Sequence, residues 1–547
     1  MQFINGKESL VVDAIDGLLR SSGGAKLARL DGYPGIKVVL RTDHKPGRVA
    51  IVAGGGSGHE PAHASFVGKG MLTAAVCGEV FASPSIDAVF AAIMAVTGKG
   101  GCLVIFKNYT GDRLNFGLAV ERARALGKKV EVVIVKDDIA LPDIPQPRGI
   151  AGVMFVEKVA GHYAEQGADL RTVAAMAQKA ADDLVSLGIS LSSCTLPGIG
   201  REDRIPDGKA ELGLGLHGEP GVDLVNFEGA RQAALVLVDR LFAAAKPARS
   251  YALLVNNLGS TTALEMNLLT NEVLASRRGA KVKLVLGPAM LVSSLDMHGF
   301  SLSLLPLTPD FEKALLSPAS PLVWPPIRTH VKPKLVKLPR DMKSKPARAS
   351  SNRSLSALVS RACDILIAAE GRLNALDAKV GDGDTGSTVA TAARHLQTAL
   401  PLMPLARLDR FFAATSEALS RSMGGSSGVL LAIFFSAASQ SASGGASWQS
   451  SLSAGLARMM AYGGAKPGDR TMIDAIAPAL GALSRGLDEA AKAARAGADA
   501  TARMQSARAG RSSYVSASHL EGIADPGAEA VATLLEGLAN GWVVPAS

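Results

Sequence analysis

Three aspartates, Asp377, Asp382 and Asp384, fall within one short stretch of the sequence that is also rich in glycine. Clustered carboxylates repel one another, and each resists ionising unless a cation lies between them. No His or Cys lies within the stretch, and a ligand set made of oxygen atoms favours a hard ion such as Mg²⁺ over Zn²⁺. The glycines allow a tight turn that can approach a phosphate. The stretch therefore predicts a magnesium and nucleotide-phosphate site, and its alternative reading is a solvated Asp/Gly turn.

Two polar segments in the first half each follow an apolar, β-branched run. Residues 54–61 (Gly-Gly-Gly-Ser-Gly-His-Glu-Pro) follow the run 49–53, and residues 107–112 (Lys-Asn-Tyr-Thr-Gly-Asp) follow the run 102–106. Such runs predict buried strands, and open α/β sheets bind ligands at the carboxyl ends of their strands. We therefore expect His59, Lys107 and Asp112 to lie at one ligand-binding edge. The alternatives are a helix cap for His59 and a turn residue for Asp112.

A third candidate is His217, within residues 213–221 (Gly-Leu-Gly-Leu-His-Gly-Glu-Pro-Gly). The spacing matches G-x-G-x-x-G, the dinucleotide-binding pattern. However, Pro220 breaks the helix that this pattern requires, and Asp239, about twenty residues on, falls in a helical stretch. We therefore reject a dinucleotide site. What remains is a histidine flanked by glycines, whose neutral ring can attack a carbonyl carbon.

The elements that must position these residues differ between the two halves. The first half alternates β-branched runs with helical stretches, which predicts an α/β layered fold in two lobes. The second half is rich in Ala and Leu with helical periodicity, which predicts an all-α domain whose polar turns meet at helix ends. The strands are expected at 49–53, 102–106, 130–135, 251–255 and 281–286. The helices of the second half are expected at 355–376, 387–399, 409–423, 451–461, 473–494 and 528–538.

A basic segment separates the halves. Between Pro326 and Arg353 lie nine basic residues and one acid, a net +8 out of the chain's +9. The four prolines of this segment disfavour helix and central strand, so we predict a stiff linker. Because the folded parts are almost neutral and the linker has no interleaved aromatic residues, nucleic acid is not an expected partner. The predicted domains are 1–327 (lobes about 1–187 and 188–327), the linker 328–352, and 353–547.

Bulk properties bound the class of protein. A chain of 547 residues with 48% hydrophobic content holds several domains. The longest apolar run, near residue 430, is too short to cross a membrane, and the N-terminal residues include three acids and no signal-peptide pattern. The four cysteines are widely spaced and form no C-x-x-C pair, so we predict neither disulfides nor a zinc site. We expect a cytoplasmic protein with no membrane association.

Taken together, the segments 54–61, 107–112, 211–221, 377–386, 424–428 and 468–472 resemble the dihydroxyacetone kinase family over nearly the whole chain. The resemblance is to the fused type, with the substrate domain first and the ATP domain second. It implies phosphorylation of dihydroxyacetone by ATP with Mg²⁺, an α/β substrate domain, an all-α helical-barrel ATP domain, and a homodimer. Residues 256–262 and 287–290 depart from the commonest family wording, which leaves the dimer geometry open.

The resemblance also implies roles for individual residues. His217 corresponds to the histidine that binds the ketone covalently as a hemiaminal, and His59 and Asp112 to residues that orient or deprotonate the attacking hydroxyl. Asp377, Asp382 and Asp384 match the magnesium ligands. The substrate-contacting positions are Gly56, Ser57, Gly58, His59, Lys107 and Asp112. The nucleotide-contacting positions are Thr385, Gly386, Ser387, Thr388, Ser426, Ser427, Gly463, Thr471, Met472, Arg511, Asp525, Pro526 and Gly527.

Three alternatives to a dihydroxyacetone kinase stay open at this point. The first is a kinase for glyceraldehyde or for a four-carbon ketose such as erythrulose. The second is a phosphotransferase-system relay in which bound ADP is recharged by a phosphoprotein, although the fusion of both domains favours exchangeable ATP. The third is a non-catalytic sensor, which predicts the loss of a catalytic position, whereas His217, His59, Asp112 and the three aspartates are all present.

Overall fold

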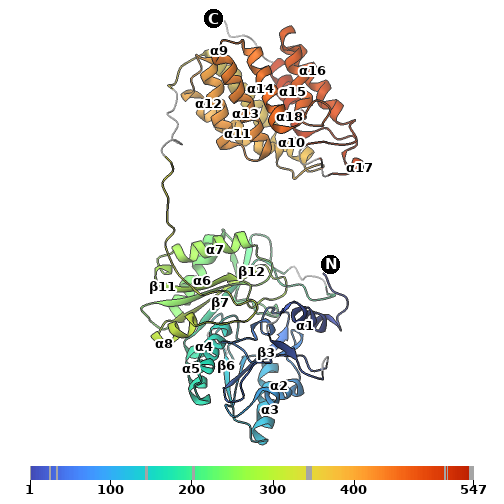
Figure 1. Ribbon diagram of the computed structural model, residues 1–547. Helices are drawn as coiled ribbons and strands as arrows, with labels where there is room; N and C mark the ends of the chain where they lie inside the picture. The colour runs from blue at the N-terminus through green and yellow to red at the C-terminus, as the bar shows by residue number, and fades with distance from the viewer. Residues whose placement is uncertain are drawn as a thin grey trace. The chain divides into compact units, whose positions relative to one another are not determined.

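Residues 2–23, 26–32, 35–141, 146–199, 204–339, 348–509, 513 and 515–540 are described by the computed structural model of the chain. The chain divides into two compact units, Met1–Leu335 and Val336–Ser547 (Figure 1). The first is an α/β unit with two sheets, and the second is helical. Each unit is described on its own below.

The first sheet holds six strands in the order β1-β2-β4-β3-β5-β6. Its central strands β4, β3, β5 and β6 run parallel, and β1 and β2 are antiparallel at one edge. Parallel strands that are covered on both faces are apolar throughout, as in β5, where all six residues are buried. The bounds are β1 Leu27–Arg29, β2 Val38–Arg41, β3 Ala50–Ser57, β4 Ala74–Val80, β5 Cys102–Lys107 and β6 Val130–Val135.

The second sheet holds seven strands in the order β13-β11-β10-β12-β7-β8-β9. Only the β10–β11 pair is parallel; the other neighbours are antiparallel. The edge strand β13 falls in the segment predicted to begin the linker, and it pairs with β11. The bounds are β7 Val185–Ser190, β8 Lys209–Leu212, β9 Asp223–Asn226, β10 Tyr251–Asn257, β11 Val282–Ala289, β12 Gly299–Pro306 and β13 Arg328–Thr329.

Helices and sheets of this unit alternate in five layers (Figure 1). Helices α2 and α3 cover the outer face of the first sheet, α6 and α7 cover the outer face of the second, and α1, α4, α5 and α8 lie between the sheets. The middle helix α4 is buried almost all round, as expected for a helix without a solvent face. The bounds are α1 Leu10–Ser21, α2 Ile86–Val96, α3 Thr110–Ala125, α4 Val153–Gln166, α5 Leu170–Asp183, α6 Ala230–Ala244, α7 Ala263–Ala275 and α8 Pro309–Leu316.

The second unit contains α-helices and short 3₁₀ turns in its described residues. Its cores are formed by large side chains between α9, α11, α12 and α13, and by alanines between α15, α16 and α18, where small residues allow close helix packing. No helix of the described chain is long and apolar enough to cross a bilayer. The bounds are α9 Arg353–Ala368, α10 Glu370–Asp377, α11 Thr385–Ala399, α12 Leu408–Ser422, α13 Gly425–Ser443, α14 Trp448–Gly463, α15 Ile473–Ala482, α16 Leu487–Thr501, α17 Ala517–Leu520 and α18 Pro526–Ala539.

The structure confirms the predicted fold class and all five predicted strands, and it corrects the helices in three places. The predicted helix 355–376 is two helices, α9 and α10, that meet at Ala369. The predicted helix 473–494 is also two, α15 and α16, because Gly486 adopts a positive φ of 118° between them. Helix α13 was not predicted, because its apolar residues show no amphipathic period.

Candidate active-site residues

Four rings from four separate segments meet near the ends of β3, β4 and β5 in the first unit. The ring centroids of His217 and His59 lie 5.0 Å apart, and those of His217 and Tyr109 lie 4.6 Å apart. Phe81 stacks on His59 at 5.2 Å and meets the His217 ring edge-on at 5.1 Å. The structure therefore brings together the two histidines that the sequence singled out, which are 158 positions apart in the chain.

The hydrogen bonds of His59 fix its tautomer. Its Nδ1 lies 2.8 Å from the Ser293 carbonyl oxygen, which can only accept, so Nδ1 carries the proton and Nε2 keeps a lone pair. Nε2 is buried and has no hydrogen-bond partner. Burial, helped by the positive charge of Lys107, holds the pKa of His59 well below its usual value. His59 is thus a neutral imidazole with a proton-accepting atom available.

His217 is held in the same tautomer by a carboxylate. Its Nδ1 donates to Glu219 Oε1 at 2.8 Å, and its backbone N–H donates to Glu219 Oε2 at 3.0 Å. Burial alone raises the pKa of Glu219, but the bonds from His217 prevail and lower it to about 2, so the carboxyl is ionised. Because Nδ1 makes this bond, Nε2 is the ring nitrogen that can act as a nucleophile when the imidazole is neutral. The segment lies between β8 and β9, so a strand and not a helix follows its glycines. This agrees with the rejection of a dinucleotide site, which requires a helix at that place.

Lys107 and Asp112 are buried beside the rings, at the end of β5 and in the first turn of α3. Asp112 accepts a hydrogen bond from Ser83 Oγ at 2.6 Å, and burial raises its pKa. The Lys107 ammonium is 1% exposed, its Nζ has no hydrogen-bond partner, and burial lowers its pKa. A buried donor without a partner is rare in folded proteins, so Lys107 points to a polar ligand at this position.

The glycine-rich end of β3 and the residue that follows it pack against the rings. Gly58 has a φ of 96°, and a Cβ there would lie 2.7 Å from Phe81 Cε1, so only glycine allows Phe81 to stack on His59. The backbone N–H of Gly58 donates to Glu60 Oε2, and Ser57 Oγ donates to the Gly78 carbonyl, each at 2.8 Å. A Cβ at Gly56 would meet Ala82 N at 2.8 Å. In this structure Gly56, Ser57 and Gly58 thus allow the close packing of the backbone and rings around His59.

In the second unit the three predicted aspartates converge. Ligand oxygens of Asp377, Asp382 and Asp384 all lie within 4.8 Å of one another. Asp377 ends α10 and is buried, and its Oδ2 accepts from the backbone N–H groups of Asp384 and Thr385 at 3.0 and 3.1 Å. Asp382 and Asp384 are exposed. Three carboxylates at this spacing fit a hard divalent cation such as Mg²⁺.

Helix α11 begins directly at this acidic turn, and the start of α13 offers a second set of backbone donors. Thr385, Gly386, Ser387 and Thr388 form the first turn of α11, and Asn374 fixes that turn by accepting from Ser387 N at 2.9 Å and donating to Ser387 Oγ at 2.8 Å. Ser426 and Ser427 lie in the first turn of α13. The first N–H groups of a helix have no intrahelical partner and attract phosphate. These two turns therefore suit the phosphate-binding role that the resemblance implies.

The residues predicted to lie near the nucleotide base come from three helix ends. Gly463 ends α14, Thr471 and Met472 precede α15, and Asp525, Pro526 and Gly527 begin α18. A Cβ on Gly527 would lie 3.2 Å from Met472 Cβ, so the last two segments touch. Burial raises the pKa of Asp525, which caps α18, to about 6. Arg511 lies outside the described residues.

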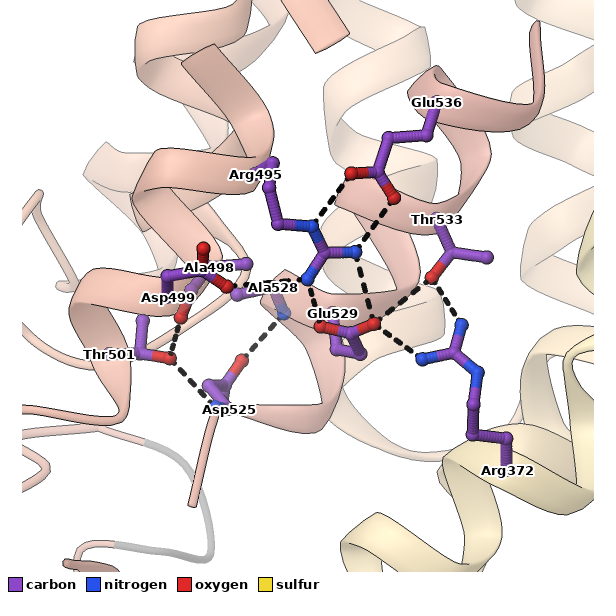
Figure 2. A network of polar contacts seen from close by, with 10 residues as sticks. All are labelled: Arg372, Arg495, Ala498, Asp499, Thr501, Asp525, Ala528, Glu529, Thr533 and Glu536. Atoms are coloured by element: carbon purple, nitrogen blue, oxygen red, sulfur yellow. Dashed lines mark hydrogen bonds and ion pairs between the residues drawn. The ribbon is translucent and has the colours of Figure 1, made fainter. Parts of the chain in front are cut away.

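A network of ion pairs joins helices α10, α16 and α18 (Figure 2). Arg495 on α16 contacts two carboxylates of α18, Glu529 at 2.6 Å and Glu536 at 2.8 Å. Glu529 also pairs with Arg372 on α10 at 2.5 Å. Because α10 ends on Asp377 and Asp525 caps the start of α18, the network joins helices that carry residues predicted to bind the metal and the base.

Several residues of these sites escaped the sequence analysis. Tyr109 and Glu219 lie inside motifs that were identified, but nothing in their spacing distinguished them. Phe81, Ser83 and Ser293 lie in other segments and reach the site only through the fold. Arg470 is fully buried, with Nη2 donating to the Ile523 carbonyl at 2.7 Å, and a buried arginine has no signature in a single sequence.

Comparison with protein-family models assigns both units. A Dak1 domain model matches residues 25–322, and a DAK2 domain model matches residues 379–540. Among curated proteins, the chain is 49% identical to the dihydroxyacetone kinase of Citrobacter freundii, with 98% of this chain and 99% of that protein covered. It is 40% identical to a putative 3,4-dihydroxy-2-butanone kinase of Solanum lycopersicum, with 97% and 96% covered. It is 38% identical to the triokinase/FMN cyclase of Homo sapiens, with 98% of each covered.

Solved structures give the same relationship. The native crystal structure of the C. freundii dihydroxyacetone kinase matches with a TM-score of 0.71 and 47% identity, covering 99% of both chains. The structure of that kinase in complex with AMP-PNP and Mg²⁺ matches with a TM-score of 0.70 and 46% identity over the same coverage. A kinase of this similarity thus binds an ATP analogue together with the ion that the acidic turn would suit.

Proposed function

This chain belongs to the dihydroxyacetone kinase family, and we propose that it transfers the terminal phosphate of ATP to a hydroxyl group of dihydroxyacetone. One observation carries the proposal: two imidazole rings lie 5.0 Å apart, and each has its Nδ1 in a hydrogen bond, which leaves its Nε2 for chemistry. One can bond to a ketone carbon while the other accepts a hydroxyl proton. The relative at 49% identity is a dihydroxyacetone kinase, which supports the same reaction here.

In the proposed first step His217 captures the ketone as a hemiaminal. Nε2 attacks the carbonyl carbon, an N–C bond forms, the C=O π electrons move to the oxygen, and that oxygen takes up a proton. The Glu219 carboxylate, 2.8 Å from Nδ1, stabilises the positive charge that the ring gains. A substrate of about six heavy atoms offers few contacts. Covalent capture selects ketones over glycerol, which has similar hydroxyls but no carbonyl.

In the proposed second step a substrate hydroxyl loses its proton as it attacks phosphorus. His59 Nε2 is neutral, buried and without a partner, so it is suited to accept this proton. Asp112 and Lys107 border the same space and would orient the hydroxyls of the substrate. A positioned general base of this kind contributes roughly 10²–10⁴-fold to the rate.

The nucleotide is proposed to bind the second unit. Asp377, Asp382 and Asp384 would hold Mg²⁺, which would neutralise the charge on the transferring phosphoryl group. The N-terminal turns of α11 and α13 would donate backbone N–H groups to the phosphates. Thr471, Met472, Gly463, Arg511 and the segment Asp525 to Gly527 would contact the base side. A bound cation would offset the mutual repulsion of these carboxylates.

Two other substrates have support from the relatives. The plant relative is named for a four-carbon ketone and the human relative for a triose, so erythrulose and glyceraldehyde are the competing substrates. A panel of dihydroxyacetone, glyceraldehyde, erythrulose and glycerol with ATP and Mg²⁺ decides among them. We expect the highest kcat/KM for dihydroxyacetone and no turnover of glycerol. Absence of turnover with ATP alone would favour the phosphoprotein relay instead.

We also propose a homodimer, as the family resemblance implies. Light scattering on the purified chain is expected to give twice the monomer mass of 56.3 kDa. A monomeric mass over the micromolar range would contradict this assembly without touching the proposed chemistry.

A further inference from the structure

The loop that carries His217 is rich in glycine. It joins β8 to β9, and two of its glycines, Gly213 and Gly218, have positive φ angles of 72° and 79°. Glycine allows many backbone conformations, so a loop of this composition holds a side chain in one place only if other groups fix it. The proposed reaction requires the His217 ring to face His59 at a fixed distance. The groups that fix the loop therefore bear on the chemistry.

Two arginines donate to backbone carbonyls on either side of His217. Arg148 Nη2 lies 2.7 Å from the Gly213 carbonyl oxygen. Arg204 Nη1 lies 2.6 Å from the Gly218 carbonyl oxygen. Both arginines come from segments outside the loop, 65 and 14 positions away along the chain. Because a guanidinium donor is charged, it forms shorter and stronger hydrogen bonds than a neutral donor.

A carboxylate orients each of these arginines. Arg148 Nε donates to Asp138 Oδ2 at 2.8 Å, and Arg204 Nη2 donates to an oxygen of Glu211 at 3.0 Å. The other oxygen of Glu211 accepts from Gly221 N, at the end of the same loop, at 2.8 Å. The side chains of Asp138 and Glu211 are 4% and 8% exposed, so both ion pairs are nearly buried. The planar guanidinium can bond to a carboxylate and a carbonyl at once, in a geometry that a lysine does not reproduce.

One short segment after β11 ties the two histidines together. The Ser293 carbonyl accepts from His59 Nδ1 at 2.8 Å. The next residue, Ser294, is fully buried and donates its hydroxyl to the Leu216 carbonyl at 2.5 Å. Leu216 directly precedes His217 in the chain. Two adjacent residues thus hold the segments of both rings, and a single stretch of backbone relates one ring to the other.

We propose that Arg148, Arg204 and Ser294 are positioning residues of the ketone site, which hold the His217 ring at the distance from His59 that capture and proton transfer require. The inference rests on the proposed function for the reaction it serves, but the hydrogen bonds to the loop do not. In the alternative, the three donors only satisfy buried carbonyls and stabilise the unit. Kinetics and hydrogen exchange distinguish the two roles.

The kinetic test uses Arg148→Ala in the full chain. Displacement of a reacting group by about 1 Å can lower a rate by roughly 10²-fold, so kcat/KM for dihydroxyacetone is expected to fall by about that factor. The KM for ATP is expected to stay unchanged. Guanidinium ion, added far below the concentrations that unfold proteins, should recover about tenfold of this loss, because it can bond again to Asp138 and to the Gly213 carbonyl.

Arg124→Ala is the matched control for this variant. Arg124 Nη2 also donates to a backbone carbonyl, that of Val130 at 2.9 Å. Val130 pairs with Cys102 at the start of β5, at the opposite end of that strand from Lys107. Arg124→Ala should therefore leave kcat/KM for both substrates unchanged. Unchanged ketone kinetics in Arg148→Ala, or equal losses for ketone and ATP without recovery by guanidinium, would overturn the proposal.

A second test reads the position of the loop without any turnover. Amide hydrogen exchange, measured by mass spectrometry on peptides that span residues 211–221, should be about tenfold faster in Arg148→Ala and in Ser294→Ala than in the wild type. It should be unchanged in Arg124→Ala. Ser294→Ala removes no charge, so it serves if Arg148→Ala folds poorly. Unchanged exchange in the folded variants refutes the inference, whereas a wild type that turns over no ketone refutes only the proposed function.

Discussion

The two candidate sites are built by opposite means. In the first unit the functional groups are buried, with Lys107 and His59 each 1% exposed and Asp112 5% exposed. In the second unit Asp382 and Asp384 lie at the surface beside helix N-termini. Burial tunes single groups, because it keeps an imidazole neutral and a carboxyl hard to ionise. Exposure leaves Asp382 and Asp384 accessible to a cation from solvent.

This difference matches two chemical tasks. A nucleophilic ring and a proton-accepting ring both need Nε2 available, and both histidines engage Nδ1 in a hydrogen bond instead. A magnesium nucleotide needs charge and backbone donors, which a turn between helices supplies. Damage to one site should therefore leave binding at the other site intact.

Among the variants, His217→Asn is expected to show most strongly that the two sites act independently. Loss of the nucleophilic Nε2 should lower kcat/KM for dihydroxyacetone by roughly 10⁴-fold, as for other covalent catalytic residues. Binding of magnesium AMP-PNP, measured by calorimetry, should be unchanged. An active variant would show that capture is not covalent, and a variant that loses nucleotide binding would break the separation of the two sites.

The opposite result, loss of nucleotide binding with ketone binding retained, is expected from Asp382→Ala. Without one of three carboxylates, the affinity for the magnesium nucleotide should fall by roughly 10²-fold, whereas dihydroxyacetone should still bind the first unit. Calorimetric titrations with each ligand measure both. The control is Asp488→Ala, an exposed aspartate in the first turn of α16, which should change neither affinity. Retained magnesium-dependent turnover in Asp382→Ala would refute the metal assignment.

A smaller effect is expected from Glu219→Gln, which tests what the Glu219 carboxylate contributes to the His217 ring. The amide keeps the size of the side chain but no longer stabilises a positive imidazole ring. Turnover of dihydroxyacetone should fall by roughly 10²-fold, the lower end of general acid–base contributions, and the melting temperature should change little. Steady-state kinetics with varied ketone and varied ATP would place the loss on the ketone side. Equal losses for both substrates would point to damaged folding.

The contiguous motifs were within reach of sequence reasoning. The acidic turn, the two strand ends and the glycine-flanked His217 each carry their chemistry within about ten residues, and parallel strands place their carboxyl ends at one edge. Short buried strands such as β6 were predicted at their observed bounds because β-branched runs are distinctive. That these residues lie together could therefore be predicted before their geometry was known.

The supporting contacts were beyond such reasoning because they join distant positions. His63 and Glu157 are 94 residues apart, and Arg372 and Glu529 are 157 apart. A buried polar pair has no local pattern, since its partners are chosen by the packing of whole helices. Helix α13 was missed for a related reason: apolar residues all round a helix give no period. Candidate functional residues are therefore easier to predict from a sequence than the residues that position them.

The smallest predicted effect concerns the network of Figure 2 and changes stability rather than chemistry. Burial alone raises the pKa of Glu529, but the hydrogen bonds from Arg495 and Arg372 prevail and lower it. A folded pKa below the unfolded value stabilises above the unfolded pKa, and this stability is lost as pH falls through the folded pKa. Glu529→Gln should therefore lower the free energy of unfolding by about 2 kcal/mol at pH 7, since hydrogen bonds to charged groups are lost.

The gap between the wild type and Glu529→Gln should narrow as the pH falls below about 4.5, the usual value of a glutamate, and close only below the lowered pKa of the folded state. Urea unfolding of the helical unit, followed by circular dichroism at pH 7 and at pH 4, measures the difference. The exposed pair of Glu489 and Lys492 provides the control, because Glu489→Gln should give no measurable change at either pH. A gap between wild type and Glu529→Gln that stays constant with pH would show that packing, not charge, links the three helices.

The direct test of the division between the two sites is a carbon-13 NMR spectrum of the protein with dihydroxyacetone labelled at its carbonyl carbon. With wild type and no nucleotide, the bound carbon should leave the ketone region and appear as a tetrahedral carbon. The tetrahedral signal should persist in Asp382→Ala and vanish in His217→Asn. A bound substrate that keeps its ketone signal in the wild type would contradict covalent capture by the first unit.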